Sequence, residues 1–177
     1  MRAAFFGGVY SNWVALDAAL RDARRRGAEV VHCLGDLGAF GPHPDRSIEL
    51  LRERSVVILQ GNYDDAVGNE KSDCGCGYTD PRDNHFARIS YAYTFEKTSP
   101  AHRPWLAALP RRLSFEHAGL RYVLVHGSPR QQNASCGSRR LPITCSTRWR
   151  AMHLAMCSSA RTPGFTGSVS YGLGGVS

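Results

Sequence analysis

The segment EVVHCLGDLGAFGP, residues 29–42, contains the pattern that decides the fold. Its first part, from Glu29 to Leu34, is a short apolar run of the kind that forms a buried strand, and Gly35-Asp36 follows directly. In open parallel sheets, the loops that follow the carboxyl ends of the strands are the functional ones. The segment therefore predicts a strand of a parallel sheet with a site residue at its end.

The flanking sequence alternates between strand and helix patterns. Asn12 is suited to cap a helix that runs to about Arg26, and Pro44 suits the first turn of another helix. The expected elements are strands at 3–6, 29–34 and 56–59, helices at 12–26, from 44 onward and from 99 to 109, and a hairpin of 113–115 with 122–125 around Ala118-Gly119. This order predicts one α/β domain with a parallel sheet covered on both faces.

Residue types that bind metals follow three of these strands. Asp36 follows the second strand, Asn62 lies in Gly61-Asn62-Tyr63-Asp64 after the third, and His126 lies in His126-Gly127 after the hairpin. A dinuclear hydrolase needs a bridging carboxylate, an amide oxygen and an imidazole, and Gly35, Gly61 and Gly127 would let phosphate approach closely. Each motif alone is a weak signal, because Gly-Asp is common in turns and a single histidine is more often structural. All three in this order, each directly after a strand, are a stronger signal.

These motifs resemble the GD, GN-x-D and HG motifs of calcineurin-like metallophosphoesterases of the small phosphodiesterase type. The resemblance covers about residues 1–133 and implies a layered α/β fold with central sheets flanked by helices, of which the C-terminal part is incomplete here. It implies metal ligands at Asp36, Asn62 and His126. The family's catalytic histidine is replaced by Tyr63, and Asp64, which would orient it, is retained, so Tyr63 and Asp64 are the candidate catalytic residues.

The first metal motif departs from this pattern. Members of the family carry Asp-x-His after the first strand, whereas this chain has Gly8-Val9-Tyr10. Gly8 has no side chain and a neutral phenol is a poor ligand, so Gly8 and Tyr10 are vacated first-metal positions. The resemblance then implies one divalent metal ion of the Mn, Fe or Zn type rather than two, either in a mononuclear enzyme or in a site without activity.

Residues 134–177 have a different composition, with Ser, Arg and Cys enriched and no acidic residue. A disordered basic tail is one interpretation. A frameshift near Asn133 is the other: read one frame over, the genetic code permits FLWESTTP across Ala134 to Pro142 and DVLLCTHTGIHW across Ala155 to Gly167, which resemble later segments of the family. We therefore expect residues 134–177 to be an irregular, out-of-frame tail beside a domain at 1–133.

Cysteine spacing favours neither a zinc site nor a redox motif. Cys74-Gly75-Cys76 lacks the two-residue gap of a zinc knuckle or a thioredoxin-type motif, and cysteines so close in sequence rarely form a disulfide. We expect a glycine-rich surface loop with free thiols.

Charge and hydropathy limit the partners. The net charge of +7 comes mostly from residues 131–177, which hold five arginines and no acid, and aromatic residues are not interleaved with them beyond Trp149, which argues against nucleic acid. No apolar run approaches the roughly 18–20 residues of a membrane span, and Met1 to Phe6 leads into a glycine turn rather than a signal peptide. We expect a cytoplasmic protein without membrane contact; the sequence does not indicate an oligomeric state.

The leading functional hypothesis is a metal-dependent phosphoesterase that hydrolyses phosphomonoesters or phosphodiesters. One alternative is a catalytically inactive scaffold of the same fold that binds protein partners, as the retromer subunit of this fold does. The other is nucleic-acid binding through the basic tail.

Overall fold

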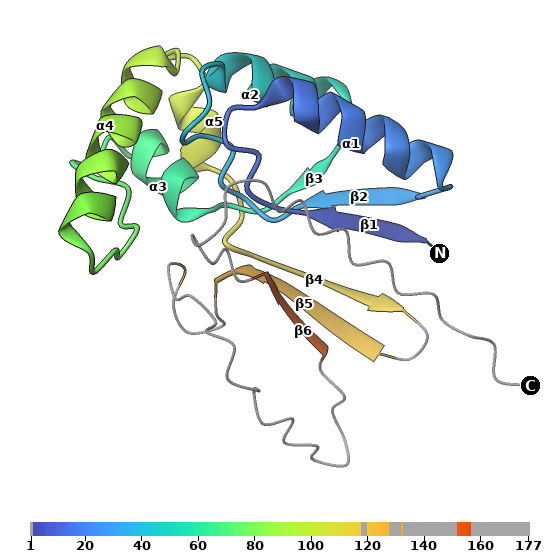
Figure 1. The fold of residues 1–177 in the computed structure, drawn as a ribbon. Coiled ribbons are helices and arrows are strands. Elements are labelled where there is room, and N and C mark those ends of the chain that lie inside the picture. The colour runs from blue at the N-terminus through green and yellow to red at the C-terminus, as the bar shows by residue number, and fades with distance from the viewer. Residues whose placement is uncertain (1, 118–119, 128–131, 133–151, 157–177) are drawn as a thin grey trace, which may run out of the picture.

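The computed structural model describes residues 2–117, 120–127, 132 and 152–156, which form helices and two three-stranded sheets (Figure 1). The first sheet has the strand order β1-β2-β3 and the second has the order β4-β5-β6. The strands are β1 (Ala3–Phe6), β2 (Val30–Cys33), β3 (Val57–Ile58), β4 (Arg112–His117), β5 (Leu120–His126) and β6 (Met152–Met156), and the helices are α1 (Trp13–Arg25), α2 (Pro44–Glu53), α3 (Asn62–Gly68), α4 (Pro81–Lys97) and α5 (Arg103–Ala107).

The first sheet is parallel, as predicted from the alternation of strands and helices. β2 lies in the middle, with Phe6 of β1 opposite Cys33 and Ile58 of β3 opposite Cys33 on the other side. Helices α1 and α2 lie over one face of this sheet (Figure 1). The expected cap of α1 is present, because the side chain of Asn12 accepts a hydrogen bond from the backbone of Ala15 at 3.1 Å.

The other face of the parallel sheet is covered by the second sheet rather than by helices (Figure 1). Leu34, Leu59 and Leu124 are buried between the two sheets. Beside them, four aromatic rings stack in the order Phe5, His32, Phe115 and Tyr122, with centroid separations of 5.0, 5.5 and 4.9 Å. The fold is therefore layered: helices, a parallel sheet, and then a second sheet.

The second sheet contains the predicted hairpin. β4 and β5 pair in antiparallel fashion, with Leu113 opposite Leu124; the expected turn at 118–119 lies outside the described residues. β6 pairs with β5 in parallel register, with Met156 opposite His126. The expectation that residues 134–177 are irregular is therefore wrong for 152–156, since the free edge of β5 offers backbone groups with which an extended segment can pair. The rest of that segment, and the domain boundary proposed at residue 133, lie outside the described residues.

Between β3 and β4 the structure differs most from the sequence-based expectation. α3 and α4 were not predicted, and α5 is shorter than the helix expected from 99 to 109. α4 has apolar residues on both sides rather than in a single stripe, because Phe86, Ile89 and Tyr93 are exposed while Ala87 and Tyr91 are buried. Among the described residues, no helix combines the length and the apolar character needed to cross a membrane.

Candidate metal centre

Three loops from the two sheets meet at the carboxyl ends of β2 and β3. Asp36 comes from the loop after β2, Asn62 begins α3 just after β3, and His126 ends β5. Nε2 of His126 lies 3.2 Å from Oδ1 of Asn62 and 3.5 Å from Oδ2 of Asp36. These three side chains, here called the acceptor cluster, are the three that the sequence singled out as metal ligands.

The orientation of the His126 ring follows from its second nitrogen. Nδ1 lies 2.6 Å from the backbone oxygen of Leu34, the residue directly after β2. A carbonyl oxygen can only accept a hydrogen bond, so Nδ1 carries a proton. In the neutral ring, Nε2 then presents a lone pair to the oxygens of Asp36 and Asn62. A backbone carbonyl that fixes the tautomer in this way is typical of histidines that bind metals.

Asn62 is oriented by a hydrogen bond of its own. Its Nδ2 donates to the backbone oxygen of Cys74 at 2.8 Å, which turns Oδ1 toward His126. Sequence patterns gave no indication of this contact, because any residue has a backbone carbonyl.

Asp36 has one carboxylate oxygen engaged and the other facing His126. Oδ1 accepts from the backbone N–H of Tyr63 at 3.2 Å, which leaves Oδ2 toward the ring. The side chain is buried, and burial raises the pKa of Asp36, while the charge of a protonated His126 would act in the opposite direction. A positively charged group beside Asp36 would therefore stabilise its buried carboxylate.

Asp64 holds together the loops that follow β2 and β3. One carboxylate oxygen accepts from the backbone N–H groups of Asp36 at 2.9 Å and Gly61 at 2.8 Å, and the other accepts from Leu37 at 2.9 Å. Burial, followed by the charge of Asp36, raises the pKa of Asp64 to about 6. Both oxygens are therefore used in holding backbone, and a catalytic role of Asp64 stays a prediction.

Tyr63 lies in the core beneath the acceptor cluster. The residue is 2% exposed, and its hydroxyl lies 3.3 Å from Oγ of Ser90 on α4. Burial raises the pKa of Tyr63 to about 12, so the phenol is neutral near pH 7. Its hydroxyl is bonded toward α4 rather than to the acceptor cluster, and its catalytic role also stays a prediction.

The glycines beside the acceptor cluster serve the packing of one loop on another. A Cβ on Gly35 would overlap the backbone of Gly61, and a Cβ on Gly61 would overlap Asp36. Gly35 also has a positive φ of 92°. This contact between loops explains Gly35 and Gly61 without phosphate. That these glycines and Gly127 lie near a bound phosphate stays a prediction.

Gly8 and Tyr10 lie beside the cluster. The backbone N–H of Gly8 donates to the oxygen of Gly35 at 3.1 Å, and that of Tyr10 donates to the oxygen of Asp36 at 3.2 Å. The Tyr10 ring folds back over Gly8, where an added Cβ would lie 2.6 Å from two ring carbons. The phenol thus occupies the space into which a side chain at position 8 would project.

The Cys74-Gly75-Cys76 segment differs from expectation. The structure contains a disulfide between Cys74 and Cys76, whereas the sequence favoured free thiols. Gly75 has a φ of 62°, and this left-handed turn brings the two Cα atoms to 5.3 Å, within the range that a disulfide spans.

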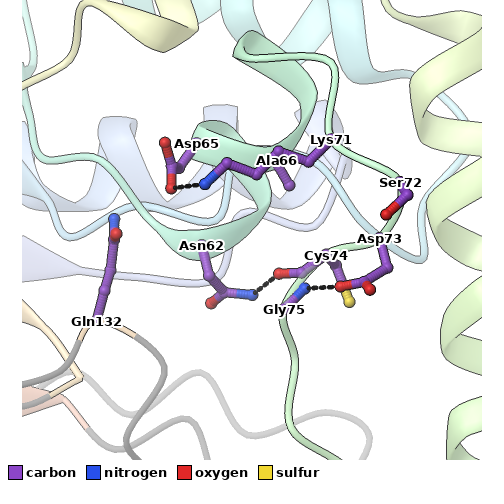
Figure 2. A pocket seen from close by; sticks show the side chains of 9 residues that line it. All are labelled: Asn62, Asp65, Ala66, Lys71, Ser72, Asp73, Cys74, Gly75 and Gln132. Carbon is purple, nitrogen blue, oxygen red and sulfur yellow. Dashed lines mark hydrogen bonds and ion pairs between the residues drawn. The ribbon is translucent and has the colours of Figure 1, made fainter.

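A cavity of about 540 Å³ adjoins the acceptor cluster on the side of Asn62 (Figure 2). Most of the residues that line it are polar or charged, and two of them, Lys71 and Asp65, form an ion pair of 2.6 Å. The lining residues are Asn62, Asp65, Ala66, Lys71, Ser72, Asp73, Cys74, Gly75 and Gln132.

The chemistry of the acceptor cluster fits a single divalent cation. A carboxylate oxygen, an amide oxygen and an imidazole nitrogen converge with no proton between them when the ring is neutral, and each is oriented by a separate hydrogen bond. Within the described part of the chain, no group of three or more His, Cys, Asp or Glu side chains has the geometry of a metal site. The cluster therefore depends on the amide of Asn62 as its third donor.

The chain is similar in sequence or in structure to several known proteins. No protein-family model matches the chain. An uncharacterized protein of Methanocaldococcus jannaschii is 27% identical over 128 residues, which are 72% of this chain and 49% of that protein. The crystal structure of a hypothetical protein from Pyrococcus horikoshii OT3 matches with a TM-score of 0.62 at 23% identity and covers 76% of this chain and 58% of that one. The crystal structure of a metallophosphoesterase from Sphaerobacter thermophilus matches with a TM-score of 0.55 at 32% identity, over 75% of this chain and 49% of that one.

These likenesses show that the chain has a metallophosphoesterase-type layered α/β fold, as the sequence predicted. The match from Pyrococcus horikoshii, at 23% identity, bears on the fold alone. The chain spans about half the length of the curated relative that it matches.

Proposed function

We propose that this protein is a metal-dependent phosphoesterase in which Asp36, Asn62 and His126 hold one divalent cation of the Mn, Fe or Zn type. One observation carries the proposal: Nε2 of His126 faces two oxygen acceptors while the proton of the ring is used on Leu34. Hydrogen-bond acceptors that are buried close together, as these are, are unfavourable unless a cation or a proton lies between them. The likeness to a metallophosphoesterase supports the cation.

Each residue of the chain would have a defined task. Asp36 would supply the only negative charge among the ligands, and Asp64 would keep its loop in place through the backbone. A bound cation of this kind polarises a phosphoryl oxygen and lowers the pKa of a bound water molecule. The cavity beside Asn62 would receive the rest of a phosphomonoester or phosphodiester substrate.

Gly8 and Tyr10 favour a single cation. Because the ring of Tyr10 lies over Gly8, the space at position 8 is taken by a phenol side chain, which is a poor metal ligand. The resemblance assigns a first metal to these positions, so the proposed site is mononuclear.

An inactive scaffold that binds protein partners is the second candidate, and one observation favours it. Tyr63 stands where the resemblance implies a catalytic histidine, and its buried hydroxyl is bonded toward Ser90. The phenol is therefore poorly placed to transfer a proton to a leaving group. The substrate, the cytoplasmic location and the reading-frame hypothesis remain predictions in either case.

Calorimetry with Mn²⁺ tests the metal site. The protein should bind one cation, and Asp36→Ala should abolish binding because it removes the only anionic ligand. Two tight cations, or undiminished binding by the variant, would contradict the proposal. An aryl phosphodiester then separates the two candidates: metal-stimulated hydrolysis that Asn62→Ala abolishes indicates an enzyme, and no hydrolysis with any of the three metals indicates a scaffold.

A further inference from the structure

The disulfide between Cys74 and Cys76 lies against a proposed metal ligand. Asn62 donates from Nδ2 to the backbone oxygen of Cys74 at 2.8 Å (Figure 2). The same nitrogen lies 3.6 Å from Sγ of Cys76. One end of the Asn62 amide is thus held by the cystine segment, and the other end faces His126. The orientation of the amide depends on where the carbonyl of Cys74 lies.

The segment that carries this carbonyl is anchored at both ends by α4. The hydroxyl of Tyr91 donates to the backbone oxygen of Lys71 at 2.6 Å, and Asn84 donates to the backbone oxygen of Tyr78 at 2.7 Å. Between these anchors lie Gly75 and Gly77, both with positive φ, which make this backbone easy to rearrange. The disulfide is the covalent constraint that fixes the backbone between the anchors.

A local role of this disulfide follows from its short span. A cross-link between residues two apart in sequence closes a very small loop, and the stabilisation that a disulfide gives by restricting the unfolded chain grows with loop length. Its main effect should therefore be on the backbone next to it. That backbone includes the carbonyl that orients Asn62.

We propose that the Cys74–Cys76 disulfide is a redox-sensitive site that sets the orientation of Asn62 and, through it, the affinity of the acceptor cluster for a divalent cation. This inference rests on the proposed metal site. Cys74 and Cys76 both border a second cavity, of about 460 Å³, and Cys74 also borders the cavity beside Asn62, so small thiols have a route to the S–S bond.

The redox step is a thiol–disulfide exchange with a dithiol reductant. The reductant gives two electrons and two protons, the bond between Cys74 and Cys76 breaks to form two thiols, and the reductant becomes a cyclic disulfide. The Cys74 carbonyl is then free to move, and Asn62 loses the contact that turns Oδ1 toward His126. Loss of a hydrogen bond that orients a metal ligand weakens metal binding by about 10- to 100-fold.

The test measures Mn²⁺ affinity in both redox states. Mn²⁺ is a suitable probe because it prefers oxygen donors and binds thiols weakly. In a background with Cys136, Cys145 and Cys157 replaced by serine, the full-length protein is reduced, freed of reductant without oxygen and titrated by calorimetry. Alkylation and mass spectrometry count the free thiols, and failure of Cys74 and Cys76 to become alkylated after reduction would overturn the proposal.

The expected result is a dissociation constant for Mn²⁺ that rises by about 10- to 100-fold on reduction. Cys74→Ser/Cys76→Ser should bind as weakly as the reduced protein and should not respond to reductant. Cys76→Ser alone should behave in the same way, which guards against misfolding of the double variant. Equal affinity in the oxidised and reduced states would overturn the proposal.

A second measurement separates this proposal from the metal site itself. The side-chain amide of Asn62, assigned in an NMR spectrum by its loss in Asn62→Ser, should shift on reduction without metal. If Mn²⁺ binds in neither state, the proposed function fails, and the NMR result alone decides the redox inference. An unchanged amide signal would then overturn it.

Discussion

A carboxylate oxygen of Asp64 lies 2.9 Å from the backbone nitrogen of Asp36, which is 28 residues earlier in the chain. The same oxygen accepts from Gly61, and its partner oxygen accepts from Leu37. One buried side chain therefore holds together the loops that follow β2 and β3. The position of Asp36, the proposed acidic ligand, therefore depends on Asp64, which accepts hydrogen bonds from the backbone of its loop.

Asp64→Asn should destabilise the fold and the site together. The amide that replaces one carboxylate oxygen would place N–H groups against backbone N–H groups, and a buried donor left unpaired costs about 1–3 kcal/mol. Chemical denaturation measures the loss of unfolding free energy. Asp83→Asn, an exposed substitution of the same kind, serves as the control; equal effects of the two variants would contradict the role assigned to Asp64.

Gly8→Asp should lower stability for two reasons: Gly8 has a φ of 68°, a left-handed conformation that strains other residues, and the new Cβ would lie 2.6 Å from the Tyr10 ring. Overpacking of this kind costs about 1–3 kcal/mol. Adding Tyr10→His should relieve the overlap with the phenol ring but not the backbone strain at position 8. The double variant has a carboxylate at position 8 and an imidazole at position 10, so it should bind two Mn²⁺ ions where the parent binds one. Calorimetry gives the stoichiometry. A parent protein that already binds two, or a double variant that still binds one, would show that these positions are not the vacated first-metal positions.

Stability should fall in mild acid partly because of His32. The ring is buried in the aromatic stack, and its Nδ1 has no hydrogen-bond partner among the residues that the structure describes. Burial lowers the pKa of His32 below its ordinary value of 6.5. The unfolded chain therefore binds this proton more readily, and stability is lost as the pH falls from 6.5 toward the lower pKa of the folded state. Each pH unit between the two pKa values corresponds to about 1.4 kcal/mol.

His32→Phe should keep the ring stack and reduce this acid sensitivity. Denaturation at several pH values between neutrality and pH 5 measures the slope. His85→Gln, at an exposed position, should leave the slope unchanged. A slope as steep in His32→Phe as in the parent would contradict the assignment.

The reading-frame hypothesis is decided at the level of DNA. The encoding sequence, read one frame over from about Asn133, should contain FLWESTTP and DVLLCTHTGIHW in that order. Other residues in that frame at both places would reject the hypothesis.

Much of the first sheet could be predicted because its signals are local. Asn12, Pro44 and the apolar runs 29–34 and 56–59 each indicate an element within a few residues, and all four are confirmed to within one or two residues at most ends. α4 could not be predicted in this way. Its inner face is chosen by contact with the loop after β2, where Thr94 and Ser90 accept from Ala39 and Phe40, rather than by an apolar period.

The candidate site, too, could be predicted only where its signals are local in the sequence. Its three side chains could be named from the sequence because each follows a strand directly, and parallel strands bring their ends to one edge. Their use as metal ligands stays a prediction. The contacts that orient them could not be foreseen, since they involve the carbonyls of Leu34 and Cys74, which any residue would offer. The disulfide was missed because sequence spacing alone argues against it, whereas the left-handed turn at Gly75 permits it.

The separation between Asn62 and His126 has a consequence for synthesis of the chain on the ribosome. The two residues are 64 positions apart, which at about 5–20 residues per second corresponds to roughly 3–13 s of translation. During that interval the nascent chain has Asp36 and Asn62 but not the imidazole, and the carbonyl of Leu34 has not yet met its partner. The proposed metal site is therefore complete only after β5 has emerged, so cation binding there would be a late event that follows the docking of the second sheet.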